Sequence, residues 1–198
     1  MKKKPTAGII LAAGMSIRFG SLKQLATIGK GTILSRVIEA AAKSNLDQIV
    51  LVLGHESSRI IKELGKDLNR PKVQVVINPA YREGMSGSLQ RGLREIKDAF
   101  PSVMIILGDH PFLKTDTINL ILDRFWISDR DICVPAREGK RGLPVCISSK
   151  YYPDIFNITG DKGAREIIKD NPDGVLYLEI DDPGCFIDID RETDIKGL

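Results

Sequence analysis

The sequence lacks the features that mark disulfide-rich, membrane-spanning and nucleic-acid-binding proteins. Its three cysteines, Cys133, Cys146 and Cys185, are widely spaced and form no Cys-x-x-Cys pair, which argues against a disulfide framework and a zinc site. No apolar run approaches the ~18 residues of a membrane span. The net charge of +3, from 29 basic and 26 acidic residues, is too small to indicate nucleic acid as a partner. We therefore expect a cytoplasmic protein with buried, reduced thiols and no nucleic-acid or membrane partner.

The rest of the composition is that of a globular protein of one domain. Hydrophobic residues make up 42% and charged residues 28% of the 198 residues, which are ordinary globular values. An apolar run at residues 7–13 follows three lysines, as in a signal peptide, but it is short, contains Gly8 and leads into Arg18. With no linker, repeat or low-complexity stretch, we expect a single domain over residues 1–198, with residues 1–6 as a flexible tail.

Apolar runs alternate with amphipathic stretches through the first two-thirds of the chain. Short buried strands are expected at residues 8–13, 49–53, 73–77 and 103–107, because these runs show no polar alternation. Helices are expected between and after them, with apolar residues at helical spacing over 33–41, 60–68, 89–100 and 118–126. Four successive strand–helix repeats predict a three-layer α/β/α sandwich with a mostly parallel sheet.

The pattern loosens in the last third of the chain. Strands are expected at residues 132–134, 143–148 and 175–179, around a helix at 163–169 that Asp161 would cap. The segment from Phe186 to Asp190 is expected to form a last strand, followed by a short helical turn.

The loop after the first strand has the composition of a phosphate-binding loop. Ligands of open parallel sheets bind beyond the carboxyl ends of the strands. Here the run from Leu11 to Gly20 contains small residues that let the backbone present N–H groups to an anion, and Arg18 and Lys23 add positive charge. It is neither a Walker loop nor a G-x-G-x-x-G loop. We expect it to hold a triphosphate; the alternative is an ordinary turn with surface cations.

Carboxylates follow two of the expected strands. Asp109 stands after the strand at 103–107, between Gly108 and His110, where it suits Mg²⁺, which takes one or two carboxylates with phosphate oxygens and water. Asp188 and Asp190 would face the same side of the last strand, so they would need a nearby cation; solvated acids at a strand end are the alternative. His110 is either a general base, a metal ligand or a hydrogen-bonded neighbour.

Three further loops combine glycine with polar residues. Ser86 and Ser88 stand where the third helix begins, so their segment could offer N–H donors to an anion or a nucleobase, or the serines could simply cap the helix. The loops at 141–144 and 159–165 are expected to form a lip over a second substrate.

These motifs together resemble those of the MobA-like nucleotidyltransferase family, and most of all its molybdenum cofactor cytidylyltransferases. They occur in order along nearly the whole chain: Leu11-Ala12-Ala13-Gly14-x-Ser16-x-Arg18-Phe19-Gly20 with Lys23, Asn78-Pro79, Gly84-Met85-Ser86-x-Ser88-Leu89, Gly108-Asp109-x-Pro111, Gly142-x-Pro144-Val145, Gly160-Asp161-x-Gly163-Ala164-Arg165 and Asp188-Ile189-Asp190. The resemblance implies a Rossmann-like fold of the nucleotide-diphospho-sugar transferase type.

The implied reaction is transfer of a nucleoside monophosphate from an NTP to a phosphate, with release of pyrophosphate. The resemblance assigns catalytic roles to Arg18, Lys23 and Asp109, and Mg²⁺ to Asp109 and Asp190. The implied nucleotide-binding residues are Leu11, Ala12, Ala13, Gly14, Arg18, Lys23, Asn78, Ser86, Ser88, Gly108 and Asp109. The implied acceptor-binding residues are His110, Gly142, Pro144, Gly160, Asp161 and Gly163.

At position 13 the chain is similar to the CTP-using branch of the family, because it has alanine where guanylyl-transferring relatives usually have glycine. The chain departs from the family at two places, with Arg191-Glu192-Thr193-Asp194 where Thr-Pro-Glu-Asp is usual and Gly142-Leu143-Pro144 where Gly-His-Pro is usual. The expected acceptor is a molybdopterin-type cofactor, handed over to a molybdoenzyme or its chaperone.

Three alternatives remain: a GTP-using molybdopterin guanylyltransferase, a sugar- or alcohol-phosphate cytidylyltransferase, and a non-catalytic nucleotide- or cofactor-binding protein.

Overall fold

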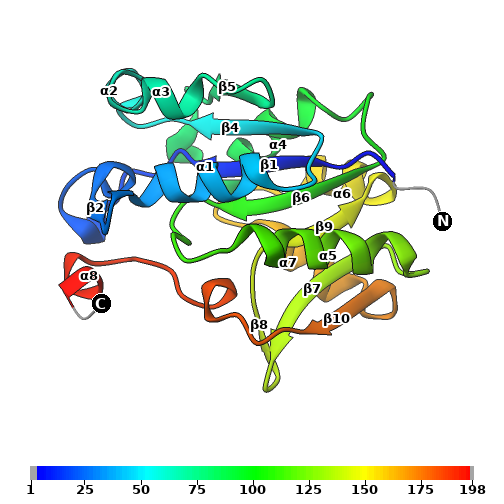
Figure 1. Cartoon of the computed structure of the whole chain (residues 1–198). Helices are drawn as coiled ribbons and strands as arrows, with labels where there is room; N and C mark the ends of the chain where they lie inside the picture. Colours follow the sequence, from blue (N-terminus) through cyan, green and yellow to red (C-terminus); the bar gives the residue numbers. More distant parts are fainter. Residues whose placement is uncertain (1–3, 197–198) are drawn as a thin grey trace.

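An eight-stranded mixed sheet runs through the middle of the molecule, with helices on both of its faces (Figure 1). The computed structural model describes residues 4–196. Residues 1–3 of the expected tail lie outside this range. Thr6, at the other end of that tail, is fully buried, and its hydroxyl lies 2.7 Å from that of Ser102. The three-layer α/β/α sandwich predicted from the sequence is confirmed.

The sheet is parallel except where β8 and β9 enter it. Its strands are β1 (Ala7–Ala12), β4 (Gln48–Leu53), β5 (Val73–Ile77), β6 (Ser102–Leu107), β7 (Ile132–Arg137), β8 (Lys140–Arg141), β9 (Val145–Ser148) and β10 (Val175–Glu179). They lie in the order β10-β7-β9-β6-β1-β4-β5, and β8 pairs with β7. β9 runs antiparallel to β6 and β7, and β8 runs antiparallel to β7. A separate hairpin joins β2 (Thr27–Ile28) to β3 (Gly31–Thr32).

The helices follow the strands closely. They are α1 (Ile33–Lys43), α2 (Ser57–Glu63), α3 (Gly65–Leu68), α4 (Met85–Arg94), α5 (Thr115–Ile127), α6 (Tyr152–Asn157), α7 (Ala164–Asp170) and α8 (Glu192–Lys196). α1 begins with a capping box, in which the side chains of Thr32 and Ser35 each accept a hydrogen bond from the other's backbone N–H. The apolar stretch at 60–68 forms two short helices, α2 and α3, rather than one.

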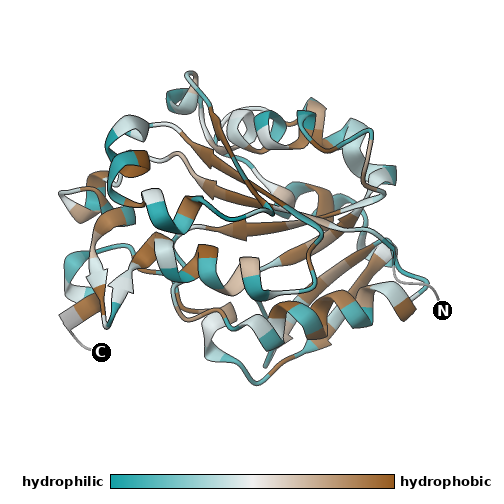
Figure 2. Ribbon diagram, turned by 45° about the horizontal axis from the view of Figure 1, so that its top comes forward, coloured by the Kyte–Doolittle hydropathy of each residue, from teal (hydrophilic) through white to brown (hydrophobic). Residues whose placement is uncertain are grey.

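Side chains of β1 alternate between two cores, one on each face of the sheet. Ile10 and Ala12 join the core under α1, α2 and α5, whereas Ile9 and Leu11 join the core under α4, α6 and α7. Both faces of the central strands are therefore buried, which explains their continuous apolar runs. Figure 2 shows these hydrophobic strands in the interior.

Two further local expectations, at Asp161 and at residues 186–190, are wrong. Asp161 does not cap the helix after it, because α7 begins at Ala164 with Gly163 at its N-cap. The segment from Phe186 to Asp190 forms no strand. It runs across the strand ends instead of alongside a strand: Leu143 N–H donates to Cys185 O at 2.9 Å, and Ile189 N–H donates to Asp109 O at 3.0 Å. The expected helical turn after it is α8.

The cysteines are free and buried, as predicted. Burial raises the pKa of Cys133 and of Cys185 to about 12, so both thiols are protonated at neutral pH. Within residues 4–196, no helix is both long enough and apolar enough to cross a membrane.

Candidate active site

Most of the predicted site residues lie at the switch point of the sheet, where successive strands begin to be added on the other side of β1. The chain runs from β1 outward to β4 and β5, then returns to place β6 on the other side of β1. The loops after β1 and β6 therefore leave in opposite directions, which opens a crevice at their carboxyl ends. Gly108 N–H donates to Leu11 O at 2.9 Å and holds the two loops together at this point.

A cavity of about 540 Å³ occupies the crevice. It is lined by most of the predicted nucleotide-binding residues, namely Leu11, Ala12, Ala13, Gly14, Arg18, Lys23, Ser88, Gly108 and Asp109, and by the predicted metal ligand Asp190. A larger cavity of about 740 Å³ lies beside α1 and the loop before α5, but none of the predicted nucleotide-binding residues lines it.

Gln24, which sequence reasoning missed, lines the cavity and fixes the first loop by hydrogen bonds. The buried Gln24 amide donates to the carbonyls of Ala12 and Gly14 at 3.1 and 3.0 Å, and its oxygen accepts from the Ser16 hydroxyl at 3.2 Å. His55 N–H donates to the Ala13 carbonyl at 3.1 Å. The N–H of a trans peptide points opposite to its C=O. The N–H groups that follow these three carbonyls therefore point away from their partners, as an anion-binding loop requires.

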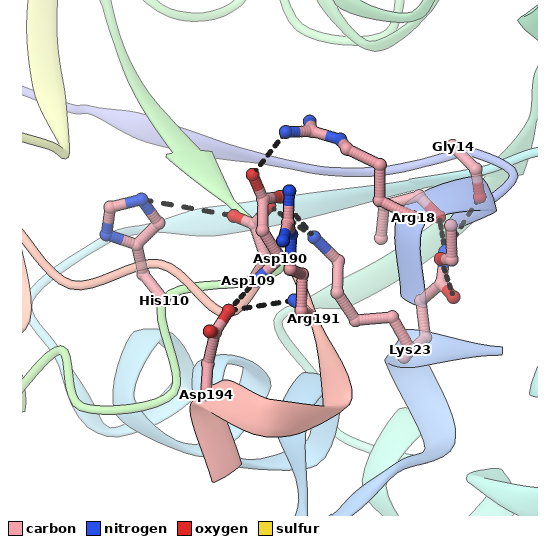
Figure 3. A network of polar contacts seen from close by, with 11 residues as sticks. Gly14, Arg18, Lys23, Asp109, His110, Asp190, Arg191 and Asp194 are labelled. Carbon is pink, nitrogen blue, oxygen red and sulfur yellow. Dashed lines mark hydrogen bonds and ion pairs between the residues drawn. The ribbon is translucent and has the colours of Figure 1, made fainter. Parts of the chain in front are cut away.

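Two cations and two carboxylates meet in the cavity (Figure 3). The Lys23 ammonium lies 2.9 Å from Asp109 Oδ2 and 3.4 Å from Asp190 Oδ1. The Arg18 guanidinium lies 2.6 Å from Asp190 Oδ2. The Lys23 side chain is 14% exposed, whereas that of Arg18 is 71% exposed. Lys23 therefore lies deep in the cavity, whereas Arg18 lies at its solvent-exposed opening.

The carboxylates fit a divalent cation. Asp109, Asp188 and Asp190 each offer one ligand atom, and these atoms lie within 4.8 Å of one another. Asp109 Oδ1 is buried and has no hydrogen-bond partner among the described residues. Carboxylates this close repel one another unless a cation lies between them, and hard divalent cations prefer oxygen ligands. The structure therefore leaves both Asp188 and Asp190 within reach of a cation held by Asp109.

His110 lies beside Asp109 but does not line the cavity. It is buried, with Nδ1 3.4 Å from the Gly184 carbonyl and Nε2 3.9 Å from Asp109 Oδ1. The second distance is too long for a hydrogen bond.

Asn78, Ser86 and Ser88 brace the loop that begins α4. The Asn78 amide donates to Ser88 Oγ at 3.0 Å, and Asn78 and Ser88 are both buried. The Ser86 hydroxyl donates to Gly160 O at 2.8 Å. Neither serine caps α4, whose N-cap is Gly84 with no side-chain hydrogen bond. Asn78 and Ser86 therefore support the cavity from outside its wall.

The two loops that were predicted to form a lip, at residues 141–144 and 159–165, lie in different places: only the second one reaches the cavity. Gly84 has a φ of 112°, and a Cβ there would lie 2.3 Å from Gly160. This close approach brings Asp161 into the lining of the cavity. A Cβ on Gly163 would meet the Met85 sulfur at 2.9 Å.

Gly142 and Pro144 are not in the lining. A Cβ on Gly142 would lie 2.7 Å from the Cys185 carbonyl, so this loop packs against the segment at 185–186.

Tyr81 and Arg82 line the cavity and were also missed from the sequence. The Tyr81 hydroxyl lies 3.3 Å from His55 Nδ1, and the Arg82 guanidinium lies 5.7 Å from the centre of the Tyr81 ring. Their only signal in the sequence is their place between Pro79 and Gly84.

Comparison with known proteins identifies a family. The family model described as MobA-like NTP transferase domain matches residues 8–175. The purine catabolism protein PucB of Bacillus subtilis is 26% identical over 96% of this chain and 94% of its own. The molybdenum cofactor cytidylyltransferase of Escherichia coli is 28% identical over 94% of this chain and 97% of its own. A probable molybdenum cofactor guanylyltransferase of Thermococcus sibiricus is 27% identical over 76% of this chain and 71% of its own.

The fold is shared with solved structures. A Mycobacterium tuberculosis protein, Rv0371c, solved in complex with manganese, superposes with a TM-score of 0.74 at 23% identity, over 90% of this chain and 89% of that one. This similarity concerns the fold.

Proposed function

Because this chain belongs to the MobA-like NTP transferase family, we propose that it transfers CMP from CTP to the phosphate of a molybdopterin-type cofactor and releases pyrophosphate. The chain is a nucleotidyltransferase, in accord with its family and its similarity to the cytidylyltransferase of Escherichia coli. CTP and the acceptor are the parts that we propose. Ala13 supports CTP, and the similarity to the molybdenum cofactor cytidylyltransferase of Escherichia coli supports both CTP and the acceptor. The expected cytoplasmic location and the hand-over to a molybdoenzyme or its chaperone stay predictions.

One observation carries this proposal: Arg18, Lys23 and Asp109 meet in a cavity at the switch point of the sheet. In the reaction, an oxygen of the acceptor phosphate forms a bond to the α-phosphorus of CTP. The bond from that phosphorus to the bridging oxygen breaks, and pyrophosphate leaves with the bonding electrons. Such a transfer needs positioning and neutralisation of charge rather than a protein nucleophile.

The protein's own groups supply this neutralisation. The N–H groups after Ala12 and Ala13 would contact the triphosphate. Lys23 and Arg18 would offset the charge that grows on the leaving pyrophosphate. Asp109 and Asp190, with Asp188 as a further candidate, would hold a divalent cation, for which we propose Mg²⁺. When bound, this cation would neutralise charge on the phosphate oxygens. Manganese in the Mycobacterium tuberculosis protein of the same fold supports a divalent cation in general.

The Lys23 ammonium contacts Asp109 and Asp190, so its positive charge would compete with a divalent cation for the same carboxylates. We therefore expect Lys23→Ala to bind Mn²⁺ more tightly than wild type when no nucleotide is present, by about threefold or more, because a competing charge is removed. Titration with Mn²⁺ followed by electron paramagnetic resonance measures this. Lys97→Ala, which removes an exposed lysine paired with Asp98, is the control. Weaker Mn²⁺ binding by Lys23→Ala would contradict the competition.

CTP should be preferred over GTP. We expect kcat/KM for CTP to exceed that for GTP by at least about tenfold, or about 1.4 kcal/mol of differential transition-state binding. The reason is the side chain of Ala13, in the wall where the guanylyl branch usually has glycine. Pyrophosphate release with each nucleotide and the same acceptor measures the ratio. Equal rates, or faster release from GTP, would place this chain with guanylyltransferases such as that of Thermococcus sibiricus.

A panel of nucleotides and phosphorylated acceptors tests the function as a whole. Pyrophosphate should be released from CTP with a molybdopterin-type acceptor. Release only with a sugar or alcohol phosphate would identify the protein as a sugar- or alcohol-phosphate cytidylyltransferase. Binding of CTP without release with any acceptor would leave a nucleotide-binding protein.

A further inference from the structure

The segment that carries Asp188 and Asp190 is not held by the sheet. It forms no strand and contacts the loop after β6 through the hydrogen bond from Ile189 N–H to Asp109 O, at 3.0 Å. A carboxylate at the end of such a segment needs another restraint if it is to meet Arg18 and Lys23 in one geometry.

Asp194 supplies that restraint. Its Oδ2 accepts hydrogen bonds from the backbone N–H groups of Asp190 at 2.9 Å and Arg191 at 2.8 Å (Figure 3). These two bonds, with Arg191 the larger cause, hold the pKa of the Asp194 carboxyl below its usual range. The side chain thus closes the turn that connects Asp190 to α8, as an acid at the third position of a helix does in a capping box.

The turn is also anchored on the apolar side. Ile195, the next residue, packs against a small core formed by Phe19, Ile28, Ile33 and Ile189. Phe19 belongs to the same loop as Arg18. The same small core therefore anchors the helix that carries Asp194, the segment that carries Asp188 and Asp190, and the loop that carries Arg18.

We propose that Asp194 is a positioning residue, which fixes the backbone of Asp190 so that its carboxylate reaches the divalent cation together with Asp109. This inference rests on the metal site of the proposed function.

The test is a titration of the full-length protein with Mn²⁺ alone, followed by electron paramagnetic resonance. Asp194→Ala removes the acceptor, and we expect the affinity for Mn²⁺ to fall by about tenfold or more, as is usual when a residue that orients a metal ligand is lost. Asp194→Asn keeps an oxygen that accepts both bonds, so its affinity should stay within about threefold of wild type. Asp181→Ala, which removes an acid that is 90% exposed and paired with Arg137, should bind like wild type.

Comparing Asp194→Ala with Asp194→Asn distinguishes the loss of the hydrogen bonds from the loss of the negative charge. If Asp194→Asn binds Mn²⁺ as weakly as Asp194→Ala, the charge of Asp194 matters and its hydrogen bonds do not, and the inference is wrong. It is also wrong if Asp194→Ala binds like wild type, or if wild type binds no Mn²⁺. Circular dichroism and melting curves should show the sheet intact in both variants. Failure of the proposed function is seen separately, as Mn²⁺ binding by wild type without pyrophosphate release.

Discussion

Replacing Asp109 with alanine should abolish nucleotidyl transfer while the protein still folds. Asp109 provides one of the three clustered carboxylates, and its buried Oδ1 has no hydrogen-bond partner among the described residues. Its Oδ2 orients the Lys23 ammonium at 2.9 Å. A single substitution thus removes a proposed metal ligand and the partner of a proposed catalytic lysine. We expect a loss of at least about a thousandfold in kcat, the upper range for one preorganised electrostatic group.

Folding should survive because Asp109 lies in a loop beyond the carboxyl end of β6 and is absent from the apolar cores. Pyrophosphate release and a melting curve check the two halves of the prediction. Asp98→Ala, at a side chain that is 85% exposed, is the matched control. Asp188→Ala and Asp190→Ala, measured beside it, tell which of the two acids is the second ligand. A near-normal rate for Asp109→Ala would remove Asp109 from the metal site.

Lys23→Ala should separate binding from catalysis. Lys23 is a point charge whose contact with the triphosphate should strengthen as negative charge builds on the leaving pyrophosphate. Interactions that grow in the transition state lower kcat more than affinity when they are lost. In the proposed function Arg18 would share the phosphates with Lys23, because its planar fork suits two oxygens. We expect Lys23→Ala to bind CTP within roughly tenfold of wild type, and to lose roughly a hundredfold or more in rate.

Calorimetric titration with CTP, set beside pyrophosphate release, measures the two quantities. Lys97→Ala, an exposed lysine outside the cavity, should change neither. An equal loss in affinity and in rate would mean that Lys23 only binds the nucleotide. If wild type itself binds no CTP, the loop from Leu11 to Lys23 is an ordinary turn, and the proposed function is wrong.

The four strands β1, β4, β5 and β6, and the loops that follow β1 and β6, could be predicted from the sequence. The strands β1, β4, β5 and β6 were predicted to within one residue at each end, because strands that are buried on both faces leave continuous apolar runs. Ligands of open parallel sheets bind beyond the carboxyl ends, so the loops after residues 11 and 107 were expected to carry the site. Asp188 and Asp190 were expected to converge as neighbours on a strand. They do lie close together, but on a segment that crosses the strand ends.

Which of these loops meet depends on the order of the strands in the sheet, and this order appears only in the folded protein. Lys23 contacts Asp109 because β6 pairs beside β1, and this long-range pairing leaves no trace in the local pattern of either strand. Gln24 and Asp194 were missed for a related reason. Both act by hydrogen bonds to backbone atoms, and every residue except proline offers the same backbone donor and acceptor. Which backbone groups a side chain reaches is set by the packing of distant segments, so periodicity and composition could not reveal it.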